Sequence, residues 1–141
     1  MKPKVSKVVV LGAVFNDKSE LLISQRYDPK IHEAHMKWDL IGGTNEFGES
    51  LEETLARELS EEAGIAAEID KFIPIYTSKL WNHESYDQHT LVFCFLCRLT
   101  SKKCTKKDNK IHRLAWKQLK DLTDLEFLPT CQPFLNYLRL K

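Results

Sequence analysis

The sequence predicts an α/β fold in which a mixed β-sheet is covered by helices on both faces. Apolar runs rich in β-branched and aromatic residues, typical of strands, alternate along the chain with segments that carry helix signals. The 141 residues, 43% of them hydrophobic, are enough to bury one full core without disulfides. No linker, repeat or low-complexity tract interrupts the chain. We therefore expect a single domain over residues 1–141.

Charge and hydropathy exclude two classes of partner. The formal net charge is +1, so we expect no broad basic surface for a nucleic-acid duplex. The N-terminal segment has a basic start and an apolar run, but the run is too short to span a bilayer and no small-residue cleavage site follows it. We expect this run to be the first strand, and we expect no membrane partner.

The four cysteines, Cys94, Cys97, Cys104 and Cys131, raise the question of disulfides or zinc. Cys94 and Cys97 have the spacing of a C-x-x-C motif. They lie in a run that resembles a buried strand, where residues three apart point to opposite faces, so these thiols cannot close on one metal or on each other. We expect buried, reduced cysteines and a cytoplasmic protein.

The strands and loops follow from apolar runs and the turn residues between them. The first two strands are expected to form a hairpin, because residues 16–18 favour a turn. A basic segment at residues 100–110 is expected to be a solvated loop. The expected strands are residues 8–15, 20–26, 38–41, 66–80 with a break at Pro74, 89–99 and 111–116, and the expected loops are residues 27–37 and 81–88.

Three further segments carry local signals. Residues 117–122 are expected to form a short helical turn, and residues 131–140 a closing helix with Pro133 in its first turn. In the loop at residues 27–37, His32 and His35 are spaced like a weak metal pair. No third ligand follows at a useful spacing, so we expect surface histidines there.

The stretch from Gly43 to Ile65 carries the strongest signals in the chain. It contains seven of the 20 acidic residues, and four of the five glycines lie in it or next to it. Ser50 and Glu53 have the spacing of a capping box, and Gly64 is placed to end a helix in a left-handed turn. These signals predict a helix from Leu51 to about Ala63.

Acidic side chains intrude on the apolar stripe of this helix. At ~100° per residue, Glu58 and Glu62 fall within about 20° of the stripe, and Glu61 lies about 60° beyond Glu58. Two carboxylates ~4 Å apart repel by about 4 kcal/mol at an effective dielectric of ~20, and they lie at the negative end of the helix dipole. A bound cation would offset both effects. The stripe consists of Leu51, Leu55 and Leu59.

The composition of the acidic cluster indicates the kind of cation. Carboxylates without an accompanying cysteine or well-placed histidine favour a hard cation, Mg²⁺ or Mn²⁺, which shares substrate phosphates. The glycine pair at the end of the strand supports this, because glycine lets backbone atoms approach a metal or a phosphate. The remaining helix glutamates, Glu52 and Glu53, are expected to be solvated, with Glu53 pairing with Arg57 at i, i+4.

The spacing of the motif resembles the complete signature of the Nudix hydrolases. The flanking segments ELLISQR and WDLIGG are similar to those of MutT-type members, and the aromatic-ended strand and helical tail resemble their C-terminal half. The resemblance implies an α/β/α sandwich with a mixed sheet and hydrolysis of a nucleoside diphosphate linked to another group. The matching positions are Gly43, Glu49, Arg57-Glu58-Leu59, Glu61-Glu62 and Gly64-Ile65.

The resemblance also implies roles for these residues. Glu58, Glu61 and Glu62 are the expected metal ligands, with the carbonyl of Gly43 adding another. Glu49 is expected to orient water or a metal from the loop, and Arg57 to hold the glutamates in place. The implied cation is Mg²⁺, for which Mn²⁺ can substitute. The expected catalytic set is Glu49, Arg57, Glu58 and Glu61.

Substrate contacts are expected outside the motif. Arg26, at the end of the second strand, is a candidate phosphate contact, with a surface arginine as the alternative. Gly42 is expected to lie against the substrate. Two roles are open for the aromatic candidates, stacking on a base and packing in the core. These candidates are Trp81, Tyr86 and Phe127.

No dedicated coenzyme A, NADH or ADP-ribose motif is recognised. The expected substrate is therefore a (deoxy)nucleoside triphosphate, including oxidised or non-standard ones, converted to the monophosphate and pyrophosphate by a monomer or homodimer. The alternatives are an ADP-ribose or nucleotide-sugar pyrophosphatase and a non-catalytic ligand-binding module.

Two positions depart from the family pattern. Ile41 stands where a proline is frequent, and Asn109-Lys110 stand where many relatives carry an acid, with Asp108 nearest. The general base is left open between a motif glutamate and an acid of a later loop.

Overall fold

The computed structural model describes residues 1–101 and 110–140 and has the predicted α/β class. Within this part of the chain, one eight-stranded mixed sheet has the order β3-β2-β1-β7-β5, while β4 pairs with β1, β6 with β7 and β8 with β2. The strands are β1 (Lys4–Phe15), β2 (Leu21–Arg26), β3 (Trp38–Asp39), β4 (Ile41–Thr44), β5 (Ala67–Phe72), β6 (Thr77–Asn82), β7 (Asp87–Leu99) and β8 (Ile111–Lys117). The helices are α1 (Leu51–Ala63), η1 (Leu119–Asp121) and α2 (Gln132–Arg139).

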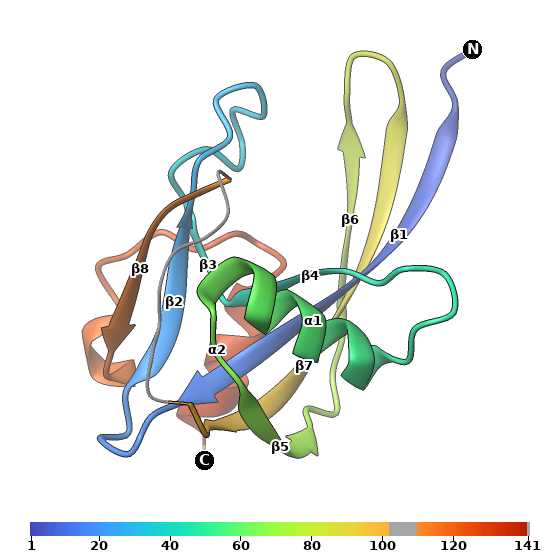
Figure 1. The fold of residues 1–141 in the computed structure, drawn as a ribbon. Helices are drawn as coiled ribbons and strands as arrows, with labels where there is room; N and C mark the ends of the chain where they lie inside the picture. Colours follow the sequence, from blue (N-terminus) through green and yellow to red (C-terminus); the bar gives the residue numbers. More distant parts are fainter. Residues whose placement is uncertain (102–109, 141) are drawn as a thin grey trace.

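The long strand β1 joins the two halves of the sheet, which are β2, β3 and β8 on one side and β5, β6 and β7 on the other. It pairs in parallel with β7 along its whole length and antiparallel with β4 over residues 9–12. At its end the chain turns into β2, which confirms the predicted hairpin. Figure 1 shows β1 and β2 diverging from this turn, with β4 crossing the space between them. The divergence leaves room for a cleft between the two halves.

Two apolar clusters lie on opposite faces of the sheet. Val10 and Val14 of β1 belong to the cluster under α1, whereas Leu11 and Ala13 belong to the cluster under α2. This alternation follows from the two-residue period of a strand. Figure 1 shows α1 in front of β1 and α2 behind it, as expected for a sandwich. The helix residues buried in these clusters include Leu55 and Leu59 of α1 and Phe134, Leu135 and Leu138 of α2.

The cysteines of the described residues are free and buried, as expected. Cys94 and Cys97 belong to different apolar clusters, which confirms that they point to opposite faces of β7. Burial raises the pKa of the Cys97 thiol to about 12 and also raises the pKa values of Cys94 and Cys131. Cys104 lies outside the described residues.

The expected strand at residues 38–41 is wrong in its extent. β3 pairs with β2, β4 pairs with β1, and the chain passes from one strand to the other at Leu40. Gly42 and Gly43 therefore lie inside β4 and not after a strand. The cause is long-range pairing, because Gly42 is the partner of Leu11 in the ladder with β1.

The expected loop at residues 81–88 is also shorter than predicted. Trp81 lies in β6 and pairs with Gln88 of β7, so only residues 83–86 connect the two strands. The loop at residues 27–37 and the closing helix are confirmed, the latter as α2. Most of the basic segment at residues 100–110 lies outside the described residues. None of the helices in the described part of the chain is long and apolar enough to cross a membrane.

Candidate functional site

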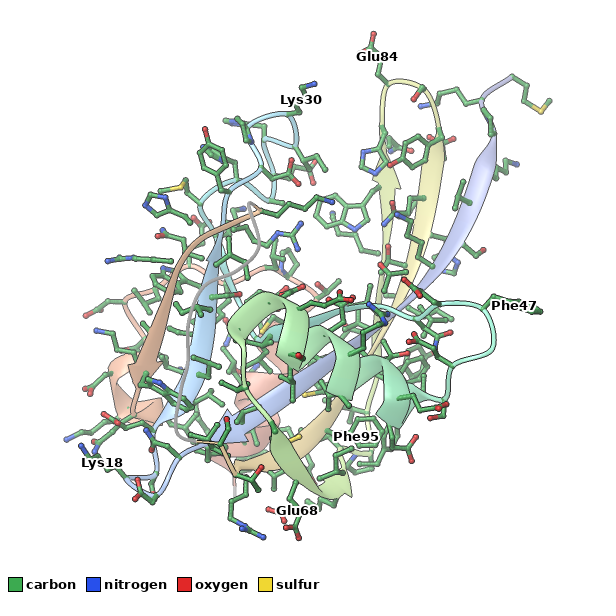
Figure 2. All side chains as sticks on the ribbon, in the orientation of Figure 1. Lys18, Lys30, Phe47, Glu68, Glu84 and Phe95 are labelled. Atoms are coloured by element: carbon green, nitrogen blue, oxygen red, sulfur yellow. The ribbon has the colours of Figure 1, made fainter. Side chains whose placement is uncertain are left out.

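A cleft of about 460 Å³ lies between the diverging halves of the sheet. One wall comes from β1 and the β6–β7 hairpin, and the other comes from the end of β2 and the loop at residues 27–37. In Figure 2, Lys30 marks the tip of that loop and Glu84 marks the tip of the hairpin, on either side of the cleft. Glycines of β4 and glutamates of α1 line the space between the walls.

The position of α1 is fixed at both ends by the predicted caps. The Glu53 backbone N–H donates to Ser50 Oγ at 3.0 Å, and the Ser50 N–H donates to Glu53 Oε1 at 2.8 Å. At the other end, Gly64 has a left-handed φ of 64°. Because Glu53 is used in the cap, the expected Glu53–Arg57 ion pair is wrong.

Arg57 instead binds the acidic groups around the cleft. Its Nε donates to Glu49 Oε2 at 2.7 Å, and its Nη2 donates to Glu49 Oε1 at 3.0 Å. Its Nη1 donates to Glu58 Oε1 at 2.8 Å and to Glu61 Oε2 at 3.2 Å. Its Nη2 also donates to the Thr44 carbonyl at 2.9 Å, which ties α1 to β4. A planar guanidinium is suited to hold several carboxylates in fixed positions.

The carboxylate of Glu49 is held in place by several hydrogen bonds. Besides Arg57, the Thr54 hydroxyl and the Glu46 N–H donate to its Oε1 at 2.9 Å each. The hydrogen bonds from Arg57, followed by that from Glu46, lower the pKa of Glu49 to about 2. The same contact with Glu49 raises the pKa of Arg57. Glu49 does not line the cleft, so its geometry favours holding Arg57 over contacting a ligand.

The structure brings Gly43, Glu58 and Glu62 to the cleft. Glu58 is only 12% exposed, and a Cβ at Gly43 would come within 2.6 Å of its Oε1. Glu61 is 58% exposed and lies outside the cleft, bound to Arg57. Over residues 1–101 and 110–140, no group of three His, Cys, Asp or Glu side chains is already arranged as a metal site. The groups that do meet, the carboxylates of Glu58 and Glu62 beside the backbone of Gly43, suit a hard cation.

Gly42 and Gly43 require glycine for different reasons. The three atoms nearest to a Cβ at Gly43 would all belong to the end of the Glu58 side chain. A Cβ at Gly42 would collide with the backbone carbonyl of Val10 and come within 2.7 Å of Leu11 Cα. Gly42 lines the cleft as expected, and it also permits the close pairing of β4 with β1.

The expected substrate contacts divide into two groups. Arg26, Trp81 and Tyr86 line the cleft. Phe127 does not line it, is 7% exposed and forms a bridge with Trp38 in the core. Of the two roles left open for Phe127, the structure therefore favours packing in the core.

Arg26 lies among acids at the inner end of the cleft. Its Nη2 is 3.5 Å from Asp28 Oδ2, and its Nε is buried without a hydrogen-bond partner among the described residues. Asp39 carries the opposite charge nearby, since the β2–β3 pairing of Ser24 with Asp39 places Asp39 on the same face as Arg26. These acids offset the charge of Arg26, which weakens the case for a phosphate contact there.

Asp39 is a cleft residue that the sequence reasoning missed. It is 8% exposed, and its Oδ1 accepts a hydrogen bond from the Leu40 N–H at 2.8 Å. Burial raises the pKa of Asp39 to about 6, although Arg26 and the Leu40 N–H act in the opposite direction. An acid within the segment WDLIGG was a signal, but only the pairing of β3 with β2 places it beside Arg26.

Lys7 was also missed. It lies on β1 and lines the cleft together with Gln88 and Thr90 of β7. The expected first strand begins at residue 8, whereas β1 begins at Lys4, so no sequence signal placed Lys7 in the sheet.

The loop histidines behave as expected for surface residues. His32 is exposed, and His35 Nδ1 accepts a hydrogen bond from the Asp28 N–H at 3.0 Å. The His35 ring also packs edge-on against Tyr27. His35 therefore stabilises the loop through its Nδ1 and its ring.

The chain matches the NUDIX domain family profile over residues 5–137. It is 35% identical over 74 residues to a "MutT-like protein" from Streptomyces ambofaciens, a match that covers 52% of this chain and 44% of that relative. The matched region thus spans less than half of that relative's length.

Solved structures share the fold over nearly the whole chain. The MutT protein from Methanosarcina mazei Go1 has a TM-score of 0.67 at 23% identity, covering 99% of this chain and 98% of that one. The MutT NUDIX hydrolase from Burkholderia pseudomallei has a TM-score of 0.73 at 22% identity, covering 93% and 96%. The NUDIX domain of Shewanella oneidensis NrtR, complexed with ADP ribose, has a TM-score of 0.70 at 19% identity, covering 100% and 91%. The profile match over residues 5–137 shows that the chain belongs to the NUDIX domain family.

Proposed function

We propose that the chain hydrolyses a nucleoside diphosphate linked to another group, with a (deoxy)nucleoside triphosphate, oxidised or non-standard ones included, as substrate. The products are the monophosphate and pyrophosphate, and the site of action is the cytoplasm. One observation carries the proposal. Glu58 and Glu62 face the cleft beside the Gly42-Gly43 backbone, where Arg57 fixes the acidic set.

The residues proposed to hold a divalent cation are Glu58, Glu62, the Gly43 carbonyl and, from the same motif, Glu61. The support is the chemistry of the donors, which are oxygen atoms only, and the close approach of the Gly43 backbone to the Glu58 carboxylate. When bound, Mg²⁺ or Mn²⁺ supplies positive charge that offsets carboxylate repulsion and neutralises charge developing on phosphate oxygens.

The other residues of the site position groups and move protons. Arg57 keeps Glu58 in place and is itself held by Glu49 through two short hydrogen bonds. The attacking water must lose a proton to a carboxylate within reach. Glu58 and Glu62 line the cleft and are the candidates among the described residues. Asp108, the candidate from a later loop, lies outside the described residues.

Two rival functions remain to be separated by experiment. The Shewanella oneidensis NrtR domain, which shares the fold, is complexed with ADP ribose, so ADP-ribose and nucleotide sugars belong in any substrate panel. A non-catalytic binding module is the second rival. The complete acidic set favours catalysis, because a domain released from catalysis has no need of it.

A nucleotide panel tests the proposal. The protein would be incubated with nucleoside triphosphates, ADP-ribose and nucleotide sugars in the presence of Mg²⁺, and the products separated by chromatography. We expect a triphosphate to yield its monophosphate and pyrophosphate. Absence of turnover by folded protein with either Mg²⁺ or Mn²⁺ would refute the enzymatic function.

A further inference from the structure

The positive side chains that line the cleft differ in what they already bind. Arg26 lies 3.5 Å from Asp28 and close to Asp39. Lys110 also has an interaction partner within the protein. Lys7 forms neither an ion pair nor a side-chain hydrogen bond with any residue in the part of the chain that the structure describes. Among these three cations, Lys7 therefore has the charge most available to a ligand.

Lys7 is built into the wall of the cleft. It lies in the middle of a ladder in which β1 pairs with β7, opposite Thr90, and its side chain is half-buried. Lys4 lies three residues earlier on the same strand, is exposed and does not line the cleft. A half-buried ammonium group without a counter-charge is unfavourable, so an anionic ligand would stabilise it.

β1 places Lys7 close to the backbone segment that borders Glu58 and Glu62. Two residues further along β1, Val9 pairs with Thr44, the residue that follows Gly43. The Asn45 N–H then donates to the Val8 carbonyl at 2.8 Å, which keeps this segment beside Lys7. Arg26 and Asp39 line the cleft from β2 and β3. Figure 1 shows β2 diverging from β1, the strand that carries Lys7.

The two ends of the cleft thus differ in charge and polarity. The end with Arg26 contains two cations, Arg26 and Lys110, and two acids, Asp28 and Asp39, so its charges nearly balance. It also contains apolar Ile31, Ala34 and Leu128. Such an end suits an uncharged ring system. The Lys7 end offers the positive charge of Lys7 beside Gln88 and Thr90, where Gln88 Nε2 donates to Thr90 Oγ1 at 2.8 Å. This end suits phosphate oxygens, for which lysine acts as a point charge.

We propose that Lys7 binds the terminal phosphate of a nucleoside triphosphate and so favours triphosphates over substrates whose diphosphate ends in a sugar. The proposal rests on the proposed function, because it assumes that the diphosphate lies beside Gly43 and Glu58. A terminal phosphate brings negative charge to Lys7, whereas a sugar brings only neutral hydroxyl groups. Lys7 would then determine specificity without taking part in the chemistry.

Steady-state kinetics of Lys7→Met test the proposal. We expect KM for a nucleoside triphosphate to rise by about tenfold or more, with kcat nearly unchanged and KM for ADP-ribose unaffected. Lys7→Arg should keep most of the wild-type KM, and Lys4→Met should match wild type for both substrates. An equal rise in KM for both substrates, or no rise for either, would overturn the proposal.

Binding separates this inference from the proposed function. Calorimetric titration in EDTA would measure the affinity of wild type and of Lys7→Met for each nucleoside triphosphate and for ADP-ribose. Circular dichroism would check that Lys7→Met is folded. We expect wild type to bind a triphosphate more tightly and Lys7→Met to lose that preference. Binding of this kind without hydrolysis would contradict the proposed function alone. Hydrolysis with an unchanged preference in Lys7→Met, or a wild type without the preference, would contradict the Lys7 inference.

Discussion

Two acids near the cleft each have an arginine beside them, yet their pKa values are shifted in opposite directions. Arg57 donates two hydrogen bonds to Glu49, and these lower the pKa of Glu49 to about 2. Asp39 lies near Arg26, yet its pKa is raised to about 6 because burial outweighs the nearby charge. Hydrogen bonds to the charged form thus decide the first case, and loss of solvation decides the second.

The difference shows how the two ends of the site are built. The Arg57–Glu49 pair spans eight residues within one motif and keeps its carboxylate charged, as a positioning group requires. The Arg26–Asp39 pair depends on the pairing of β2 with β3 and keeps a carboxyl group that is easily neutralised. Four sets of variants can break or sharpen this comparison.

Replacing Glu62 by Gln should have the largest effect, at the Arg57 end. We expect kcat to fall by two to three orders of magnitude, on the order of what loss of one stabilising group costs an active site. The fold should persist, because the side chain lies at the cleft surface. Glu52→Gln, on the exposed face of the same helix, is the matched control. Wild-type activity in Glu62→Gln would remove this residue from the proposed site.

The two neighbouring glycines should respond differently to alanine. Gly42→Ala places a Cβ against the backbone of β1, which cannot yield, and should destabilise the protein by about 2–3 kcal/mol in urea unfolding. Gly43→Ala meets only the Glu58 carboxylate, which can swing away. We expect Gly43→Ala to fold with a much smaller loss of stability and to lose activity. Equal losses of stability would contradict the assignment.

Arg57→Lys tests the clamp itself. Lysine cannot donate to Glu49 from two nitrogens while also reaching Glu58, so the carboxylates should lose their fixed positions. We expect kcat to fall by about 10–100-fold, the usual cost of losing a supporting contact. Kinetics and circular dichroism would be measured together. Unchanged kcat in folded Arg57→Lys would mean that the clamp has no catalytic importance.

Asp39→Asn should give the smallest effect, visible in the pH dependence of stability. Because the folded pKa of Asp39 exceeds its unfolded value of about 3.9, the unfolded chain loses the proton first. Asp39 therefore lowers the free energy of unfolding by about 1–3 kcal/mol as pH rises from about 4 to about 6. Urea unfolding at pH 4.5 and pH 7 should show that this loss is reduced in Asp39→Asn.

Glu49→Gln is the control for the sign of that effect. The pKa of Glu49 is lowered, so this group contributes stability above about pH 4.5 that is lost as pH falls toward 2. The variant should therefore be less stable than wild type at pH 7, in contrast to Asp39→Asn. Parallel pH profiles for the two variants would contradict the distinction between the pairs.

The parts of the site that local sequence specifies were predicted well. α1 has the predicted bounds, and both halves of the capping box and the left-handed Gly64 are present. These features depend on contacts between residues close in the chain, which spacing alone reveals. The contacts of Arg57 with Glu58 and Glu61 were expected only from the family resemblance, and the pair that spacing alone predicted, Glu53 with Arg57, is replaced by the cap.

The parts that depend on pairing between distant segments were predicted poorly. Asp39 reaches the cleft only because β3 pairs with β2, and Lys7 only because β1 pairs with β7. The sequence leaves the role of Phe127 open between stacking and packing, because its bridge to Trp38 has no local signal. Register between strands is set by the whole fold, and a one-residue change would move each side chain to the other face.

The central claim is that the face of α1 beside Gly43 binds a divalent cation. Titration with Mn²⁺, followed by the electron paramagnetic resonance signal of the free ion, tests it directly on folded wild type, Glu62→Gln and Glu52→Gln. The account predicts that wild type and Glu52→Gln bind Mn²⁺ alike and that Glu62→Gln binds about tenfold more weakly or worse. Equal binding by all three proteins, or no binding by wild type, would contradict it.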